Sequence, residues 1–317
     1  MQHEQHEKPG KEYYLALLFL ILAVIFWGYS FISTKMVLKV YGPASIAFFR
    51  QVIAAVALII WLGAARGFTR VSRRDWLPLT VSAFLGIVLY FLFENTGMLY
   101  TTASNASLIV AAVPIFTMFT ETFFFKLKIT WKMIACLLLS IAGVYLVISI
   151  NGKLDFSSAR FKGNLMVVGA MVCWVFYTIV NKKLSEKYPS LMMTMLQSCI
   201  SVVLFVPWII KDIPRWQWPS WGIAGNLVYL GVFCSAMSYF FYIYAIKRLG
   251  ATIGAAFLNL IPVVTVISGF LVLQEGLAVI QIIGMALIMF SLYQISAKPK
   301  RSGPPQKVAA APESDAN

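Results

Sequence analysis

The sequence predicts an all-α integral membrane protein with ten transmembrane helices arranged as two inverted five-helix repeats. Composition is the first reason: 60% of the 317 residues are hydrophobic and 12% are charged, against about a quarter charged in soluble domains. Mean hydropathy is +0.80. The apolar residues also form blocks of about 20, long enough to cross a hydrocarbon core. Finally, the chain matches itself at an offset of 147 or 148 residues.

Short charged or turn-forming segments separate the apolar blocks and set the limits of each predicted span. The block that begins at Tyr14 runs on without a cleavage pattern, so we interpret it as the first span and not as a signal peptide. The predicted spans are 14–36, 44–65, 76–98, 102–125, 131–150, 163–184, 191–211, 220–246, 250–274 and 277–297.

These spans divide the chain into an arm, two repeats, a linker and a tail. The tail is rich in Pro, Ser and charge, and has too few apolar residues to fold alone. The predicted domains are a cytoplasmic arm (1–13), a first five-helix repeat (14–150), an external linker (151–162), a second five-helix repeat (163–297) and a disordered cytoplasmic tail (298–317).

Basic residues indicate the orientation of the spans. With ten spans, 18 of the 26 Lys and Arg residues fall on the side of the N-terminus. The positive-inside rule then predicts that both termini are cytoplasmic. The net charge of +14 sits at helix ends, without the clustered patch that nucleic-acid binding needs, so we exclude nucleic acid as a partner.

The internal repeat is carried by uncommon residues at matched positions. Trp27 matches Trp174 at the shorter offset, and Pro114 matches Pro262 at the longer one. Each half has five spans, an odd number, so the second half must enter the membrane from the opposite side. Inverted repeats of this kind are the architecture of many secondary transporters.

Several segments resemble the drug/metabolite transporter superfamily, specifically its ten-helix EamA-type transporters. The first half carries AVIFWGYSFISTK (23–35), GPASIAFFRQ (42–51) and TTASNASLIVAAVPIF (101–116); the second half carries AMVCWVFYTIVNKK (170–183) and RLGATIGAAFLNLIPVVTVISGFLVLQE (248–275). The resemblance implies export or exchange of small metabolites across the cell (inner) membrane of a bacterium. The first half departs from the family pattern, with Lys126-Leu127-Lys128 where the second half has Gln274-Glu275.

Ionisable residues inside a span are costly and are therefore candidates for function. Arg50 and Glu94 lie at similar estimated depths, so we expect them to approach each other or to share a polar outer vestibule. Tyr90 lies one turn before Glu94, and Asn95 follows it. The structural alternative for Arg50 is a salt bridge or a snorkelled side chain. Glu121, near the inner end of its span, is expected to snorkel to the interface or to pair with Lys126 or Lys128.

Other polar and aromatic residues within spans are candidates for binding a zwitterion or a planar ring. Taken singly, each is equally well explained as a contact between helices. They are Trp27, Asn105, Trp174, Asn181, Tyr239 and Asn259. Pro114 and Pro262 are expected to kink their helices and to free carbonyl groups.

The residues predict no enzyme, no cofactor and no metal site. No span contains a histidine, and the chain has no Ser-His-Asp set and no phosphate-binding glycine loop. We therefore expect a secondary transporter that exports amino acids or amphiphilic metabolites by alternating access. Alternatives are an exchanger of phosphorylated sugars or nucleotide sugars, and a membrane-embedded non-transport protein. The solute, the coupling ion (protons are one candidate) and the oligomeric state stay open.

Overall fold

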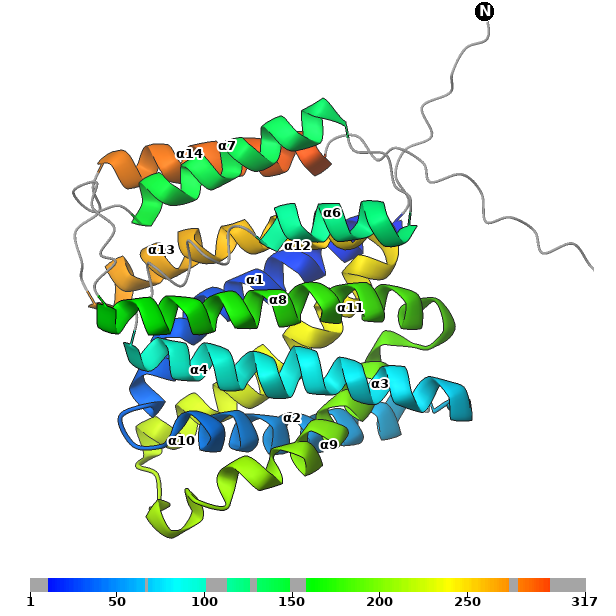
Figure 1. Ribbon diagram of the computed structural model, residues 1–317, viewed down its shortest axis with the longest axis vertical. Coiled ribbons are helices and arrows are strands. Elements are labelled where there is room, and N and C mark those ends of the chain that lie inside the picture. Colours follow the sequence, from blue (N-terminus) through cyan, green and yellow to red (C-terminus); the bar gives the residue numbers. More distant parts are fainter. Residues whose placement is uncertain are drawn as a thin grey trace, which may run out of the picture.

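The computed structural model describes residues 11–65, 68–100, 113–125, 130–148, 158–273 and 279–296, and every regular element in this part is helical. Most helices lie side by side along one common direction (Figure 1). The α-helices are α1 (Lys11–Val37), α2 (Pro43–Ala65), α3 (Trp76–Ala83), α4 (Tyr90–Tyr100), α6 (Val113–Phe125), α7 (Trp131–Ile148), α8 (Ser158–Lys187), α9 (Ser190–Ile209), α10 (Trp221–Val228), α11 (Ser238–Leu249), α12 (Ala251–Phe257), α13 (Ile261–Leu273) and α14 (Val279–Ser296).

Local sequence signals explain several helix ends. Pro43 is the first residue of α2, where its missing N–H costs nothing. The Ser220 side chain accepts a hydrogen bond from the Ile223 amide at the start of α10. Gly250 adopts a φ of +93° between α11 and α12, a backbone conformation that glycine reaches without a steric cost.

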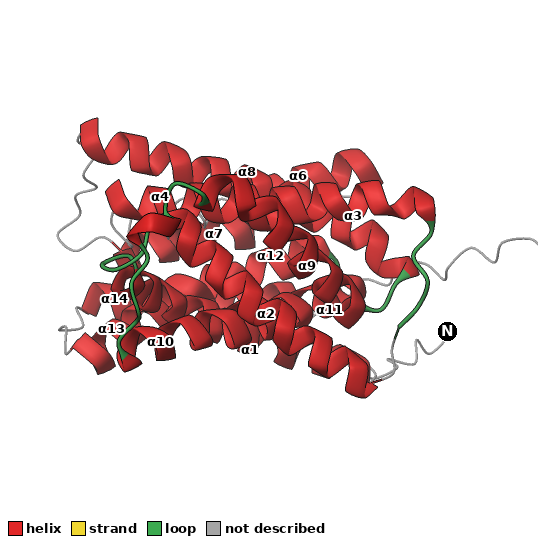
Figure 2. Ribbon diagram, turned by 90° about the horizontal axis from the view of Figure 1, so that it is seen from below, coloured by secondary structure: helices red, strands yellow, loops and turns green. Residues whose placement is uncertain are grey.

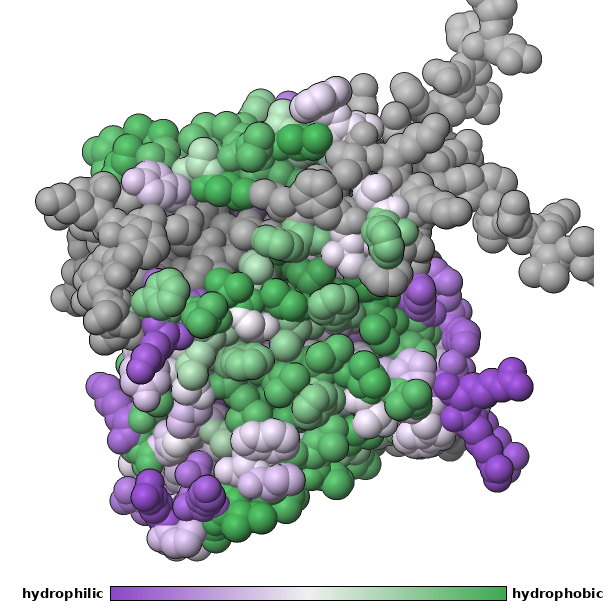
Figure 3. Space-filling view, viewed as in Figure 1, coloured by the Kyte–Doolittle hydropathy of each residue, from purple (hydrophilic) through white to green (hydrophobic). Residues whose placement is uncertain are grey.

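The lengths and composition of the helices are those of a multi-pass membrane protein. Six segments among the described residues are long and apolar enough to cross a bilayer: 11–37, 43–65, 73–100, 161–187, 190–209 and 221–249. Apolar residues cover the middle of the face in Figure 3, while hydrophilic residues gather toward the two ends of the helices. The count of ten spans and the inverted repeat stay predictions.

Helices from the two predicted repeats pack against one another. The most extensive contacts join α7 to α14, α4 to α8, α2 to α9, and α1 to α11, and Figures 1 and 2 show the same arrangement from two sides. The turn between α1 and α2 lies at one end of the bundle, called the α1–α2 end. The turn between α8 and α9 lies at the other, called the α8–α9 end.

Two spans change to π-helix near their middle. The segment η2 (Phe84–Leu89) joins α3 to α4, and η4 (Tyr229–Met237) joins α10 to α11. At the longer repeat offset, η2 falls on the C-terminal part of η4. A Cβ on Gly86 would lie 1.9 Å from Cδ2 of Tyr177, so the close approach of α8 to η2 requires a glycine. Such π-helical segments often occur at functional sites.

Candidate functional site

A cavity lies in the half of the bundle nearer to the α1–α2 end. It is bounded by α1, α2, α4, α6, α8, α11, η5 (Leu258–Leu260) and α13, and has about 660 Å³ of space between atoms, counting the part that is open to solvent. We call it the charged cavity because it contains one cation and one anion. Its lining residues are Trp27, Ser30, Phe31, Arg50, Tyr90, Phe91, Glu94, Val113, Val167, Ala170, Met171, Trp174, Tyr239, Leu258 and Ile261.

Arg50 enters the charged cavity from α2 and is 1% exposed. Its Nε donates a hydrogen bond of 2.8 Å to Oγ of Ser235 in η4. The guanidinium carbon lies 4.0 Å from the centre of the Phe91 ring, a favourable cation–π arrangement. These contacts fix the plane of the guanidinium group and leave its two terminal nitrogens available to an anion.

Glu94 faces the same cavity from α4. Tyr90, one turn earlier, donates a hydrogen bond of 2.7 Å to Oε1 of Glu94. No ion pair within 4.0 Å joins Arg50 to Glu94, both of which belong to the described part of the chain. The two residues therefore line one cavity, most of whose other lining residues are apolar or aromatic, and a direct pair between them does not form. Each charge is free to meet a complementary group.

Aromatic rings form part of the cavity wall beside the two charges. The Trp27 ring centre lies 5.3 Å from that of Trp174 and 5.8 Å from that of Tyr239. Both Trp27 and Tyr239 are fixed by backbone carbonyls of the π-helical segments: the Trp27 indole donates to the carbonyl of Cys234 at 2.9 Å, and the Tyr239 hydroxyl donates to that of Gly86 at 3.1 Å. The rings therefore form a rigid apolar surface beside the charges.

Three asparagines that the sequence proposes for binding lie away from the lining of this cavity. Asn95 donates to the carbonyl of Pro43 at 3.0 Å. Asn181 donates to Oγ of Ser82 at 2.8 Å, and Asn259 donates to Oγ of Ser140 at 2.7 Å. Each joins two helices, which is the alternative that the sequence left open. Asn105 lies outside the described residues.

The two prolines occupy matching positions at the longer repeat offset. Pro262 is the second residue of α13 and follows the 3₁₀ segment η5, which interrupts the helix between α12 and α13. Proline disfavours regular helix just before it, so the expected kink takes this form. Pro114 is the second residue of α6, and the residues directly before Val113 lie outside the description.

Sequence reasoning missed several residues that shape the site. Ser235 accepts a hydrogen bond from Arg50, and the Phe91 ring packs against the guanidinium group of Arg50. Phe31 adds to the aromatic wall. The repeat gives no signal for Ser235, because Ile87 occupies the matching position at the longer offset. Among the described residues, no group of three or more His, Cys, Asp or Glu side chains is placed to hold a metal.

Apolar helices long enough to cross a bilayer, packed around an internal cavity, indicate a multi-pass membrane protein. Residues 14–149 and 161–297 each match the EamA-like transporter family, and the chain belongs to this family. Family membership indicates a transporter. Its partners are a small-molecule solute, which it moves, and the membrane lipids that surround it.

Known proteins similar to this chain agree with the family. A relative named an uncharacterized transporter, from Archaeoglobus fulgidus, is 30% identical over 89% of this chain and 97% of its own length. A "Probable terminal-alkyne amino-acid exporter" from Streptantibioticus cattleyicolor is 26% identical over 84% of this chain and 89% of its own length. A solved crystal structure shares the fold, with a TM-score of 0.74 at 18% sequence identity. The match covers 88% of this chain and 95% of the chain in that structure.

Proposed function

We propose that this protein is a secondary transporter that exports amino acids or related amphiphilic metabolites through the charged cavity by alternating access. It acts in the cytoplasmic membrane of a bacterium, with both termini inside and ten spans in two inverted repeats. The observation that carries the proposal is one cation and one anion, unpaired with each other, on the wall of a single aromatic cavity.

The distribution of charge in the cavity favours a zwitterion. The terminal nitrogens of Arg50 suit a carboxylate, and the free oxygen of Glu94 suits an ammonium group. The wall of Trp27, Trp174 and Tyr239 offers an apolar surface to a side chain. An α-amino acid with an apolar or aromatic side chain has these three features together.

The relative from Streptantibioticus cattleyicolor supports both the class of solute and the direction. Its printed name describes an amino-acid exporter, and it aligns with most of this chain. A phosphorylated sugar is less well supported, because Arg50 is the single cation among the lining residues and Glu94 would repel a phosphate.

Matched contacts at opposite ends of the bundle support the inverted repeat and hence alternating access. Lys35, at the end of α1, donates to the carbonyl of Met98 at 2.9 Å. Lys182 in α8, which matches Lys35 at the shorter offset, donates to the carbonyl of Ile246 at 3.2 Å. Ile246 in turn matches Met98 at the longer offset. The same contact thus recurs at the other end of the bundle, as expected if the second copy is inverted.

Glu94 is proposed to couple transport to protons. It is the carboxylate that lines the charged cavity, and Tyr90 donates to one of its two oxygens, which leaves the other for a proton or an ammonium group. A proton and an ammonium group would compete for Glu94, so entry of a proton from the acidic side would release the solute there.

The test is transport by the purified protein in liposomes, with a pooled panel of amino acids and metabolites and an imposed pH gradient. We expect accumulation that depends on the gradient. Glu94→Gln should abolish this dependence, and Arg50→Gln should weaken solute affinity about 10- to 100-fold, because a charge-assisted hydrogen bond is lost.

Glu186→Gln and Arg215→Gln are the matched controls, since both side chains are exposed and outside the cavity. Flux that ignores the gradient and is unchanged in Glu94→Gln would contradict proton coupling at this residue. No flux of any panel member in the wild type would contradict the proposed solute class.

A further inference from the structure

A second group of polar residues occupies the repeat-equivalent positions of the charged cavity. Gln197 matches Arg50 at the shorter offset, and Tyr242 matches Glu94 at the longer one. Tyr177 matches Ser30, which also lines the charged cavity. We call Tyr177, Gln197 and Tyr242 the neutral cluster, because hydroxyl and amide groups replace the two charges.

The neutral cluster is fully packed in this structure. All three side chains are 0% exposed. The Tyr242 hydroxyl lies 3.1 Å from Oγ1 of Thr178, and Nε2 of Gln197 donates to Oδ1 of Asn181 at 2.7 Å. None of the three lines the charged cavity. One half of the bundle is therefore hollow at this level while its repeat-equivalent half is filled.

The neutral cluster and the neighbouring Trp174 include buried polar atoms without hydrogen-bond partners, as do Gln51 and Asn95, which follow Arg50 and Glu94 in the sequence. Within the described part of the chain, the Tyr177 hydroxyl, Oε1 of Gln197 and the indole nitrogen of Trp174 are buried with no hydrogen bond. The indole of Trp27, which matches Trp174 at the shorter offset, is by contrast bonded to the carbonyl of Cys234. Buried polar atoms without partners cost free energy, because water would satisfy them in an open state.

The equivalent acceptor for the second indole is already in use. Under the repeat, the carbonyl of Cys234 corresponds to that of Gly86, and Gly86 accepts the hydroxyl of Tyr239 instead of the indole of Trp174. Movement of Tyr239 away from Gly86 would free this carbonyl for Trp174. In such an alternative conformation Trp174 would make the hydrogen bond that Trp27 makes in this structure.

We propose that Tyr177, Gln197 and Tyr242 form a second half-site for the solute, which opens toward the α8–α9 end when the charged cavity closes. The inference rests on the proposed alternating access. The two hydroxyls donate to the carboxylate of a zwitterion, and Oε1 of Gln197 accepts from its ammonium group. The solute thus meets full charges on one face of the membrane and neutral groups on the other.

Accessibility of a thiol at Gln197 tests the half-site without any transport measurement. In full-length protein with its four native cysteines replaced by serine or alanine, Gln197→Cys is treated with a membrane-impermeant maleimide from each face. An alternative conformation is populated at about 0.1–10%. We therefore expect reaction from the α8–α9 face, about 10- to 1,000-fold slower than at Glu186→Cys, which is exposed on that face.

Ser198→Cys is the matched control, because Ser198 neighbours Gln197 on α9, is 1% exposed, and points about 100° away around the helix. Reaction at Gln197→Cys no faster than at Ser198→Cys, or reaction from the opposite face alone, overturns the proposal. Absence of transport with normal labelling would instead count against the proposed function and leave the half-site standing.

Tyr177→Phe gives a second, independent readout. It removes a hydroxyl that has no partner in the described structure, so a purely structural role predicts equal or higher thermal stability and unchanged transport. The half-site predicts equal or higher stability together with several-fold weaker apparent affinity for the solute that the liposome panel identifies. Unchanged affinity in Tyr177→Phe overturns the part of the proposal that assigns this hydroxyl to the solute.

Discussion

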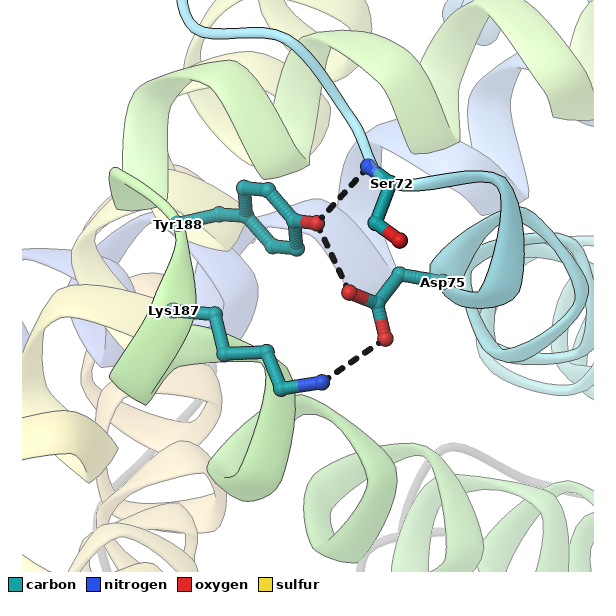
Figure 4. Close-up of polar contacts among 4 residues, drawn as sticks. All are labelled: Ser72, Asp75, Lys187 and Tyr188. Carbon is teal, nitrogen blue, oxygen red and sulfur yellow. Dashed lines mark hydrogen bonds and ion pairs between the residues drawn. The ribbon is translucent and has the colours of Figure 1, made fainter. Parts of the chain in front are cut away.

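A tyrosine hydroxyl joins two segments of the chain at each end of the bundle, but the partners differ. At the α1–α2 end, the Tyr41 hydroxyl donates to the carbonyl of Gln217. At the α8–α9 end, the hydroxyl of Tyr188, the repeat equivalent of Tyr41, donates to Asp75 at 2.7 Å and accepts from the Ser72 amide at 3.1 Å (Figure 4). Burial raises the pKa of Tyr41, so its phenol stays a donor. The tyrosine contact at the α8–α9 end therefore includes a carboxylate, whereas the one at the α1–α2 end is a neutral bond.

The two π-helical segments also differ at matched positions, here in how closely they are packed. Gly86 in η2 is pressed against Tyr177, while Cys234 in η4 has room for its side chain and its thiol lies 3.4 Å from the carbonyl of Phe26. Duplication thus accounts for the shared framework. The differences lie in which half is filled and which is hollow in this conformation.

The largest expected effect comes from making the two π-helical segments alike. Gly86→Cys places a Cβ against the ring of Tyr177, near its attachment to the backbone, where the ring has little freedom to move. Overpacking costs about 1–3 kcal/mol or more. The melting temperature of the protein in nanodiscs should fall by roughly 5–10 °C.

The reverse exchange, Cys234→Gly, serves as the control for this prediction. It leaves a small void and no clash, and should lower the melting temperature by less than half as much. Equal losses in the two variants would show that the two segments are packed alike, contrary to the geometry at Gly86.

A smaller effect should separate the two tyrosines. Tyr188→Phe removes two hydrogen bonds, one of them to a carboxylate, whereas Tyr41→Phe removes one to a carbonyl. We expect melting temperatures lower by roughly 4–6 °C for Tyr188→Phe and roughly 2–3 °C for Tyr41→Phe. Scanning fluorimetry of the two variants side by side measures the difference. A larger loss in Tyr41→Phe would mean that the neutral contact is the stronger one.

The sequence predicted what depends on composition and spacing along the chain. Apolar blocks predicted the membrane helices, and the estimated depths of Arg50 and Glu94 predicted that both face one space. It did not predict that Ser235 holds Arg50 or that Asn181 joins helices, because these depend on which helix lies beside which. Periodicity gives the face of a helix and not its neighbour.

The π-helical segments were missed for a related physical reason. An extra residue in a helical turn is stabilised by contacts across the bundle, such as the approach of Tyr177 to Gly86, and such contacts join residues far apart in the sequence. Once one irregular segment is known, the repeat predicts the place of the second, because η2 and η4 occupy matching places in the two halves. That signal tells where an irregularity recurs but not what kind it is.

The smallest expected effect concerns the charged closure at the α8–α9 end. The ammonium group of Lys187 lies 2.9 Å from Asp75, but its side chain is 60% exposed, so solvent weakens the pair. Asp75→Asn should therefore raise the population open at this end by about two- to fivefold. Spin labels on Arg73→Cys and Glu186→Cys, both exposed positions at this end, report opening as a longer component in the distance distribution.

Asp212→Asn is the matched control at the α1–α2 end, where the Asp212 carboxylate accepts from Ser45 at 2.8 Å. It should leave the Arg73–Glu186 distances unchanged. Because exposed charges are screened by salt, high ionic strength should move the wild type toward Asp75→Asn and have little effect on that variant. Identical distance distributions in the wild type and Asp75→Asn at low salt would mean that Tyr188 and Ser72 hold this end without the charge.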